Sequence, residues 1–181
     1  MFDAVENRMQ KSIDALKSEL ATIRTGRASI SLLDHVSVNY YGADVPLNQV
    51  ANLAVPEPRM VTIAPWEKNL IPDIEKAIMS SDLGLNPSSD GDMVRIVLPE
   101  LTADRRRELV KQVKQIGEKA KVSVRNIRRD ANDDVKKQVK DEGLSEDESK
   151  QMQAEIQKIT DHHITEIDQI VEHKETDILT I

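Results

Sequence analysis

The sequence predicts an α+β fold in which a small β/α/β domain is inserted into an elongated antiparallel three-helix bundle. Apolar residues recur at steps of three and four in three segments, which is the period of an amphipathic helix. Between residues 36 and 98, short runs instead alternate at a step of two, as strands do. All seven prolines lie between Pro46 and Pro99, so the helical segments on either side contain none.

The first helix is expected to end near Gly26, and the second to extend from an N-cap at Thr102 to Gly143. At ~1.5 Å per residue, roughly 39 residues make a rod of about 58 Å. Helices this long with one apolar stripe must bury that stripe against partners. The expected stripes are Val5, Met9, Ile13, Leu16, Leu20 and Ile23 in the first helix, and Leu109, Val113, Ile116, Ala120, Val124, Ile127, Ala131 and Val135 in the second.

The third helix is predicted to begin after Ser145, which forms a capping box with Glu148, and to continue to about Ile178. A tight turn at Gly143 requires the second and third helices to pack antiparallel. The stripe of the third helix is Met152, Ile156, Ile159, His163, Ile167, Ile170 and Val171.

The inserted domain is expected to contain one helix from Glu67 to Ser80, with strands around residues 36–40, 61–63 and 94–98. The predicted domains are therefore residues 1–29 with 103–181, and residues 30–102. The chain crosses this boundary twice over short segments, which we expect to act as a hinge. The hinge residues are Ala28, Ser29, Ile30, Ser31, Pro99, Glu100, Leu101 and Thr102.

Composition and motifs argue against several function classes. The chain has no cysteine, no apolar stretch near the ~20 residues of a membrane span, and no signal-like N-terminus, which favours a cytoplasmic protein without membrane contact. We expect it to be a monomer. No phosphate-loop, dinucleotide or nucleophile motif indicates an enzyme, a cofactor or a small-molecule substrate. The pair His162-His163 with Glu166 has helical i, i+4 spacing but lacks a third metal ligand, so we expect no metal. His163 falls on the apolar stripe and is expected to be a core histidine. Trp66 is expected to pack inside the small domain, with surface recognition as the alternative.

The segment Thr102–Lys140 has the opposite charge to the rest of the protein. It carries 13 basic and six acidic residues, a net +7, while the whole chain carries −7. Concentrated positive charge on one element favours a polyanionic partner, and the lack of interleaved aromatics favours folded RNA over single strands. The alternative is a solvated face, with Asp130 and Asp133 pairing with neighbouring arginines. Residues spaced by seven predict one stripe opposite the core: Arg107, Lys114, Lys121 and Arg128, with Arg125 close by.

The run Arg125–Asp133 (RNIRRDAND) resembles the bacterial-type ribosome recycling factor family. Further blocks fit in order and spacing: Thr25–Ser29, Tyr40–Gly42, Pro65-Trp66, Glu75–Pro87 (EKAIMSSDLGLNP) and Leu101–Lys111 (LTADRRRELVK). The resemblance covers essentially the whole chain. One departure is Ala103-Asp104-Arg105, where the family more often has two glutamates followed by arginine.

This resemblance implies an L-shaped, hinged fold and a non-enzymatic role in translation. Such a factor binds the large subunit of the post-termination ribosome. With elongation factor G and GTP hydrolysis by that partner, it promotes dissociation into subunits and release of mRNA and tRNA. The family's rRNA-contacting positions, together with Lys121 from the basic stripe, give the expected rRNA-binding set: Arg106, Lys121, Arg125, Arg128, Arg129 and Arg27.

A structural coiled-coil adaptor with no RNA-binding role is the alternative function. Salt separates the two hypotheses, because RNA binding weakens steeply as counterions are released, whereas an apolar contact does not.

Overall fold

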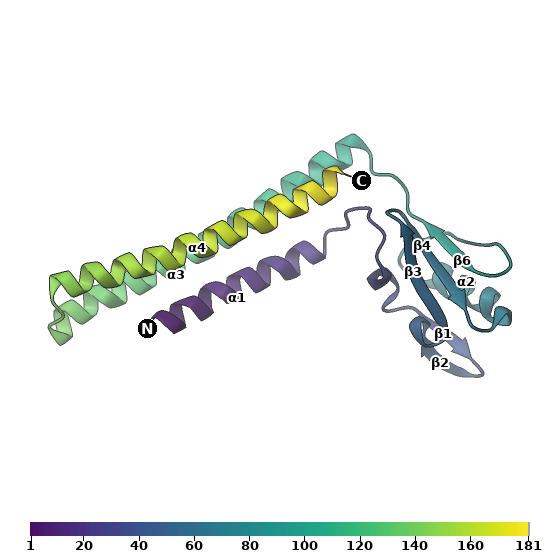
Figure 1. The fold of residues 1–181 in the computed structure, drawn as a ribbon, viewed down its shortest axis with the longest axis horizontal. Coiled ribbons are helices and arrows are strands. Elements are labelled where there is room, and N and C mark those ends of the chain that lie inside the picture. The colour runs from purple at the N-terminus through teal and green to yellow at the C-terminus, as the bar shows by residue number, and fades with distance from the viewer. Residues whose placement is uncertain (181) are drawn as a thin grey trace. The chain divides into compact units, whose positions relative to one another are not determined.

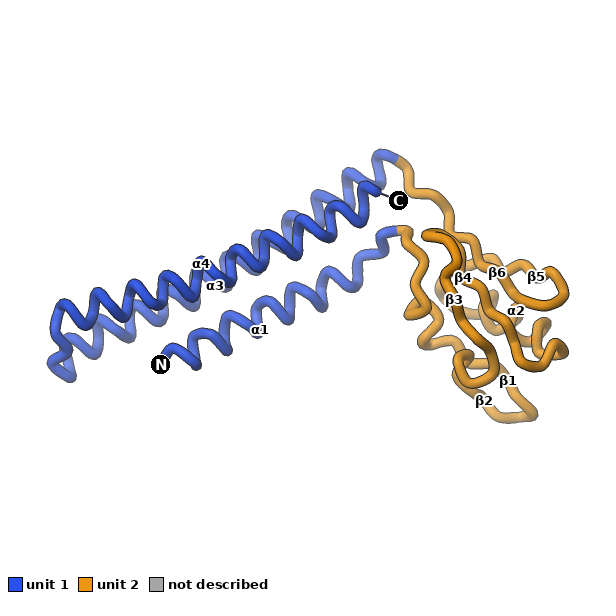
Figure 2. Tube along the Cα trace, viewed as in Figure 1, with its two compact units in different colours: residues 1–25, 103–180 blue, residues 26–102, 181 orange. Residues whose placement is uncertain are grey.

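The computed structural model describes residues 1–180 and divides them into two compact units. Unit 1 comprises residues 1–25 and 103–180, and unit 2 comprises residues 26–102 (Figure 2). The inserted domain was expected to begin at residue 30, so the structure assigns residues 26–29 to unit 2 as well.

Unit 1 is a bundle of three helices, each of which contacts the other two. They are α1 (Phe2–Ala21), α3 (Ala103–Glu142) and α4 (Glu146–Leu179). Helices α1 and α4 run in one direction and α3 in the other (Figure 1). Helix α1 is shorter than predicted: it ends at Ala21, where the Thr22 hydroxyl donates to the Glu19 carbonyl at 2.6 Å. Ile23, expected on the buried stripe, is consequently half-buried beyond the helix end.

Most residues of the predicted stripes form the buried seam of unit 1. In α4 the predicted Met152, Ile170 and Val171 are only half-buried, and one residue of the α3 stripe also departs from the prediction. Ile116 is half-buried, and Gly117 occupies the buried position in its place. A Cβ atom at Gly117 would lie 2.5 Å from Cγ2 of Val171, so glycine is what permits α3 and α4 to approach here. The prediction failed at this turn because apolar periodicity identifies large side chains and cannot identify a close backbone approach.

The connection between α3 and α4 is formed as predicted. Gly143 has φ +68°, a backbone conformation that favours glycine. Ser145 then caps α4: its Oγ accepts from the Glu148 N–H at 3.2 Å, and the Ser145 N–H donates to Glu148 Oε2 at 3.0 Å. The Ser145 N–H, and next the Ser145 hydroxyl, which donates to the same Glu148 Oε2 at 2.8 Å, hold the pKa of Glu148 below its ordinary value.

Unit 2 contains two antiparallel sheets and one α-helix. Strands β1 (Ser37–Tyr40) and β2 (Ala43–Pro46) form a hairpin. A second sheet has the strand order β3–β4–β6–β5. The α-helix of the unit is α2 (Ile71–Ser80). The remaining bounds are β3 Ala51–Glu57, β4 Met60–Pro65, β5 Pro87–Ser89 and β6 Val94–Val97, with 3₁₀ turns at Ile30–Leu33, Leu47–Gln49 and Lys68–Leu70.

The core of unit 2 lies between α2 and the strands. Ile74 and Ile78 of α2 are fully buried, together with Val38 of β1, Ile63 of β4 and Ile96 of β6. The three strands predicted from alternation are present, because each places every second side chain in this cluster. The expected helix from Glu67 starts later, at Ile71, and is preceded by a 3₁₀ turn.

Both crossings between the units lie beside each other within unit 2. A Cβ atom at Gly26 would lie 3.0 Å from Cγ of Leu101, so the two segments are in close contact. Ala28 is buried, its N–H donates to the Pro58 carbonyl at 2.7 Å, and Ser29 caps the 3₁₀ turn that begins at Ile30. Hinge motion stays a prediction, but on this side the residues outside helices and strands are 22–29, and Ile30 and Ser31 of the predicted segment belong to the 3₁₀ turn.

Within residues 1–180, no helix combines the length and the hydrophobicity needed to cross a bilayer.

Candidate nucleic-acid interface

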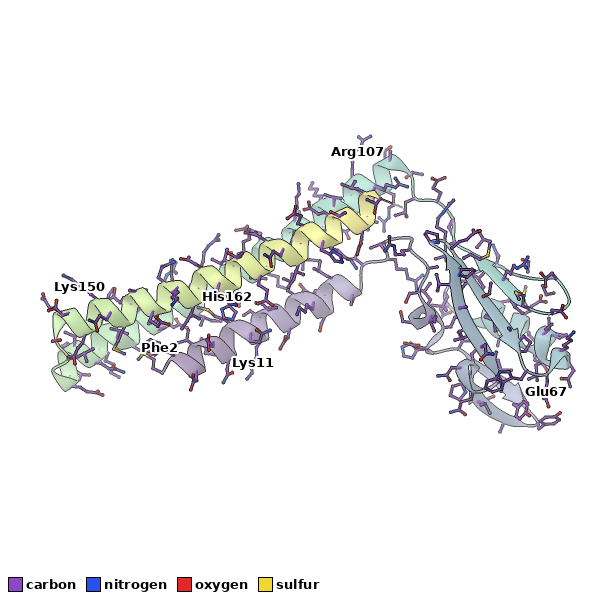
Figure 3. The ribbon with its side chains drawn as sticks, viewed as in Figure 1. Phe2, Lys11, Glu67, Arg107, Lys150 and His162 are labelled. Carbon is purple, nitrogen blue, oxygen red and sulfur yellow. The ribbon has the colours of Figure 1, made fainter. Side chains whose placement is uncertain are left out.

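An exposed basic face runs along the outer side of α3. At 100° per residue its members lie within about 60° of one another and roughly opposite the buried seam. Figure 3 shows Arg107 near the N-terminal end of the helix. We call the following residues the outer basic face: Arg107, Lys111, Lys114, Arg125, Arg129 and Lys136. All of them are exposed except Arg125, which is half-buried.

The predicted stripe of residues spaced by seven does not stay on this face. Each step of seven falls about 20° short of two full turns, so the series drifts around the helix toward α4. The side chain of Lys121 is only 22% exposed and pairs with Asp168 of α4. Arg128 is half-buried, and its Nη1 donates to Gln157 Oε1 at 3.2 Å. The expectation that Lys121 and Arg128 point opposite the core is therefore wrong: they lie at the α3–α4 flank.

The other expected rRNA-binding residues occupy different environments. Arg129 is exposed on the outer basic face. Arg106 is half-buried, since it precedes Leu109 by three residues and continues the buried seam at the helix end. Arg27 is exposed and belongs to unit 2.

Acidic neighbours neutralise the outer basic face only in part. Arg125 pairs with Glu118 at 3.1 Å, and Arg107 with Asp104 at 3.4 Å. Of the two acids named by the solvated-face alternative, Asp130 pairs with Arg8 of α1 at 2.9 Å, and Asp133 pairs with Lys136 at 3.9 Å. Exposed ion pairs contribute only about 0–1 kcal/mol and exchange readily for other anions.

Three basic side chains on this face are available to an incoming anion. Within residues 1–180, no ion pair or hydrogen bond joins Lys111, Lys114 or Arg129 to another side chain. Lys111 and Lys114 line a shallow open groove together with Arg107. Sequence reasoning did not place Lys111 on this face, although its spacing of three and four from Lys114 and Arg107 would have identified it.

Two further sequence expectations meet different outcomes. His163 is 4% exposed, and its Nδ1 lies 2.7 Å from the Ile159 carbonyl, which confirms a core histidine. Its neighbour His162, labelled in Figure 3, is exposed. Over residues 1–180, His, Asp and Glu side chains do not gather in any group of three suited to a metal ion. Trp66 is 62% exposed, so the expectation that it packs inside the small domain is wrong.

Comparison with known families accounts for nearly the whole chain. A family model described as ribosome recycling factor matches residues 16–179. The chain belongs to the ribosome recycling factor family. The matched range contains residues 26–102 of unit 2 and all of α3 and α4, and therefore the complete outer basic face.

Individual members of the family agree along the full length. The ribosome-recycling factor of Burkholderia cenocepacia (strain HI2424) is 54% identical over 98% of this chain and 95% of its own. That of Burkholderia ambifaria is 53% identical with the same coverage.

Two solved structures of ribosome recycling factors share the fold. A solution structure is 42% identical, with a TM-score of 0.72 over 99% of this chain and 96% of that chain. A second is 50% identical, with a TM-score of 0.62 over 98% of this chain and 96% of that chain. The latter describes models of the T. thermophilus ribosome recycling factor and the E. coli elongation factor G bound to the E. coli post-termination complex.

Proposed function

We propose that this chain is a ribosome recycling factor that binds the large subunit of the post-termination ribosome. With elongation factor G and GTP hydrolysis by that partner, it promotes dissociation into subunits and release of mRNA and tRNA. The chain itself catalyses no reaction in this proposal, and it acts in the cytoplasm because ribosomes do. The observation that carries the proposal is full-length membership of the ribosome recycling factor family.

The outer basic face supplies the contact with rRNA in this proposal. Its side chains extend from a rigid helix of 40 residues, so their spacing is set before binding. Arginine presents a planar fork to phosphate oxygens, and lysine a point charge, neither of which reads a base. Such a surface recognises the path of a folded RNA backbone. Two of the expected residues, Lys121 and Arg128, would contact RNA from the α3–α4 flank. Arg125 would first have to exchange its ion pair with Glu118 for a phosphate.

Arg129→Ala tests the RNA contact. Because Arg129 is exposed, we expect the free energy of unfolding to change by no more than about 0.5 kcal/mol. Large-subunit binding should weaken, and the slope of log K against log salt should fall by about one unit. Subunit splitting with elongation factor G should slow accordingly.

Lys150→Ala is the matched control. Lys150 is an exposed cation on α4, labelled in Figure 3, and its removal changes the net charge equally. It should leave the salt slope unchanged. An Arg129→Ala protein that binds and splits ribosomes like the parent would remove the outer basic face from the mechanism and favour the adaptor hypothesis.

We also propose that segments 22–27 and 99–102 act as a hinge that transmits force from the partner GTPase. Both segments lie outside helices and strands, and they touch each other at Gly26 and Leu101. Two connections restrict the units to bending rather than free drift. Spin labels at Lys11 in unit 1 and Lys76 in unit 2 should give a broad distance distribution that shifts on ribosome binding. One narrow, unchanged distance would contradict the hinge.

A further inference from the structure

Three of the four aromatic residues of the chain gather at one exposed place in unit 2. Trp66 is 62% exposed and Tyr41 is 78% exposed. The ring of Tyr40 packs edge-on against that of Tyr41, with 4.6 Å between the ring centroids. A groove between the β1–β2 hairpin and the segment Trp66–Leu70 is lined by Tyr40, Val45, Gln49, Val50, Trp66, Glu67 and Leu70. Nothing in the proposed RNA contact uses this groove.

The backbone holds these aromatic side chains outward. The Trp66 N–H donates to the Val50 carbonyl at 3.1 Å, which fixes the main chain while the indole remains in solvent. The hairpin turns through Tyr41 at φ +49° and Gly42 at φ +86°, the pattern of a two-residue turn with both central residues left-handed. A left-handed conformation is costly for a bulky residue such as Tyr41. This strain places an aromatic ring at the tip of the turn, where it gains no burial.

One polar atom in the groove has no partner. Oε2 of Glu67 is shielded from solvent and accepts no hydrogen bond within residues 1–180. Burial, and then the charge of the nearby Glu67 carboxylate and a hydrogen bond to it, raise the pKa of Tyr40, so the phenol stays protonated on one side of that carboxylate while Oε2 is left without a partner. A shielded carboxylate oxygen is costly unless a donor reaches it. The donor that suits it best is a cation.

Charge selects the kind of molecule that can bring this donor. Residues 26–102 hold five basic and ten acidic residues, a net −5. RNA phosphates are repelled by such a surface, whereas a basic polypeptide segment is attracted to it. The acidic unit 2 therefore favours a basic partner, whereas the basic face of α3 favours an acidic one.

We propose that this groove binds an arginine side chain presented by a protein partner. The guanidinium plane stacks on the Trp66 indole while its N–H groups donate to the Glu67 carboxylate. The apolar side chains of Val45, Val50 and Leu70 cover the methylene stem of the arginine. Arginine suits the site better than lysine because its planar, weakly hydrated head stacks and donates at the same time.

The test uses the full-length protein and blocked tripeptides. Trp66 is the only tryptophan, so its fluorescence reports on the groove directly. N-acetyl-glycyl-arginyl-glycinamide should change the Trp66 emission in a saturable way and shift the amide NMR signals of Tyr40 and Glu67. The citrulline tripeptide, neutral but of the same shape, should bind about tenfold more weakly, because it loses the charge-assisted hydrogen bonds.

Substitutions in the protein give the matched comparison. Glu67→Gln should weaken the binding of the arginine tripeptide about fivefold to tenfold. Glu57→Gln removes an equal charge from an exposed site of unit 2 and should leave that binding unchanged. Equal binding of the arginine and citrulline tripeptides would overturn the proposal. Equal binding of the lysine tripeptide would overturn the assignment to arginine. Stronger quenching by a uridine tetranucleotide than by the arginine tripeptide would assign the surface to RNA instead.

The inference stands independently of the RNA contact on α3. Arg129→Ala should bind the arginine tripeptide normally, and Glu67→Gln should bind isolated large subunits normally at low salt. If Arg129→Ala loses large-subunit binding as expected, but the arginine tripeptide leaves the Trp66 fluorescence of the parent unchanged, the groove proposal is refuted and the RNA contact on α3 is not.

Discussion

The two units of this molecule bury their apolar residues in different ways. Unit 1 buries a narrow seam along three helices, and in α1 and α3 each buried residue lies three or four positions from the next. Unit 2 buries a compact cluster assembled from two sheets, α2 and three 3₁₀ turns. A seam depends on periodicity within one segment, whereas a cluster depends on contacts between segments far apart in the chain. The seam can therefore be predicted from the spacing of apolar residues within each helix. The cluster can be predicted only when it is known which strands pair.

Ile127→Ala and Ile74→Ala sharpen this comparison with the largest expected effects. Each removes a buried isoleucine, from the seam and from the cluster respectively, and should cost about 2–5 kcal/mol of unfolding free energy through lost burial and a residual cavity. Circular dichroism at 222 nm follows mainly the three long helices, and Trp66 fluorescence follows unit 2.

If each unit is an independent domain, each substitution should shift only the probe of its own unit. A substitution that shifts both transitions equally would show that the two units unfold in one cooperative transition and are not independent domains.

Gly117→Ala tests how tightly the seam is closed. The new Cβ would lie 2.5 Å from Val171, so about 1–3 kcal/mol of overpacking opposes about 1 kcal/mol of improved helix propensity. We expect a net loss of about 1–2 kcal/mol in chemical unfolding. In a double-mutant cycle, Val171→Ala should restore part of that loss. A more stable Gly117→Ala protein would mean that the helices relax freely and that the seam is loosely packed.

Ser145→Ala has the smallest expected effect and carries a pH signature. Loss of the cap should cost about 1 kcal/mol at neutral pH. The pKa of Glu148 is lowered in the folded state, chiefly by the Ser145 N–H and next by its hydroxyl. The stabilisation is therefore complete above the unfolded pKa of a glutamate and is lost as pH falls through the lower folded value.

Between about pH 6 and pH 3 the parent should lose more stability than Ser145→Ala, since glutamate titrates in this range. Parallel pH curves for the two proteins, measured by urea unfolding, would show that the Ser145 hydroxyl adds nothing to the pKa shift of Glu148 beyond what the Ser145 N–H supplies.

Sequence reasoning predicted unit 1 more completely than unit 2. The capping box and the α3–α4 turn were correct because their signals are local. Strands β2, β3 and β5 were missed: each contains a proline, and β3 has a register irregularity between Ala54 and Glu57. The basic charge of α3 was also predicted, but the division of its arginines between outer face and flank was not. That division depends on where α4 packs, which the sequence of α3 alone does not encode.

Trp66 shows the same limit at a single residue. A tryptophan after a proline in an apolar stretch is normally core, and only the tertiary arrangement of the β1–β2 hairpin shows that it lines a groove.

The uninterrupted length of α3 has a mechanical consequence. Its 40 residues form a stiff beam of about 60 Å, with no proline at which it could buckle. The beam begins at Ala103, directly after the chain leaves unit 2. A tilt of about 5° imposed at that end would displace the far tip by about 5 Å, roughly the pitch of one helical turn. A small rotation at the junction would therefore move the far end of α3 by more than the length of a hydrogen bond.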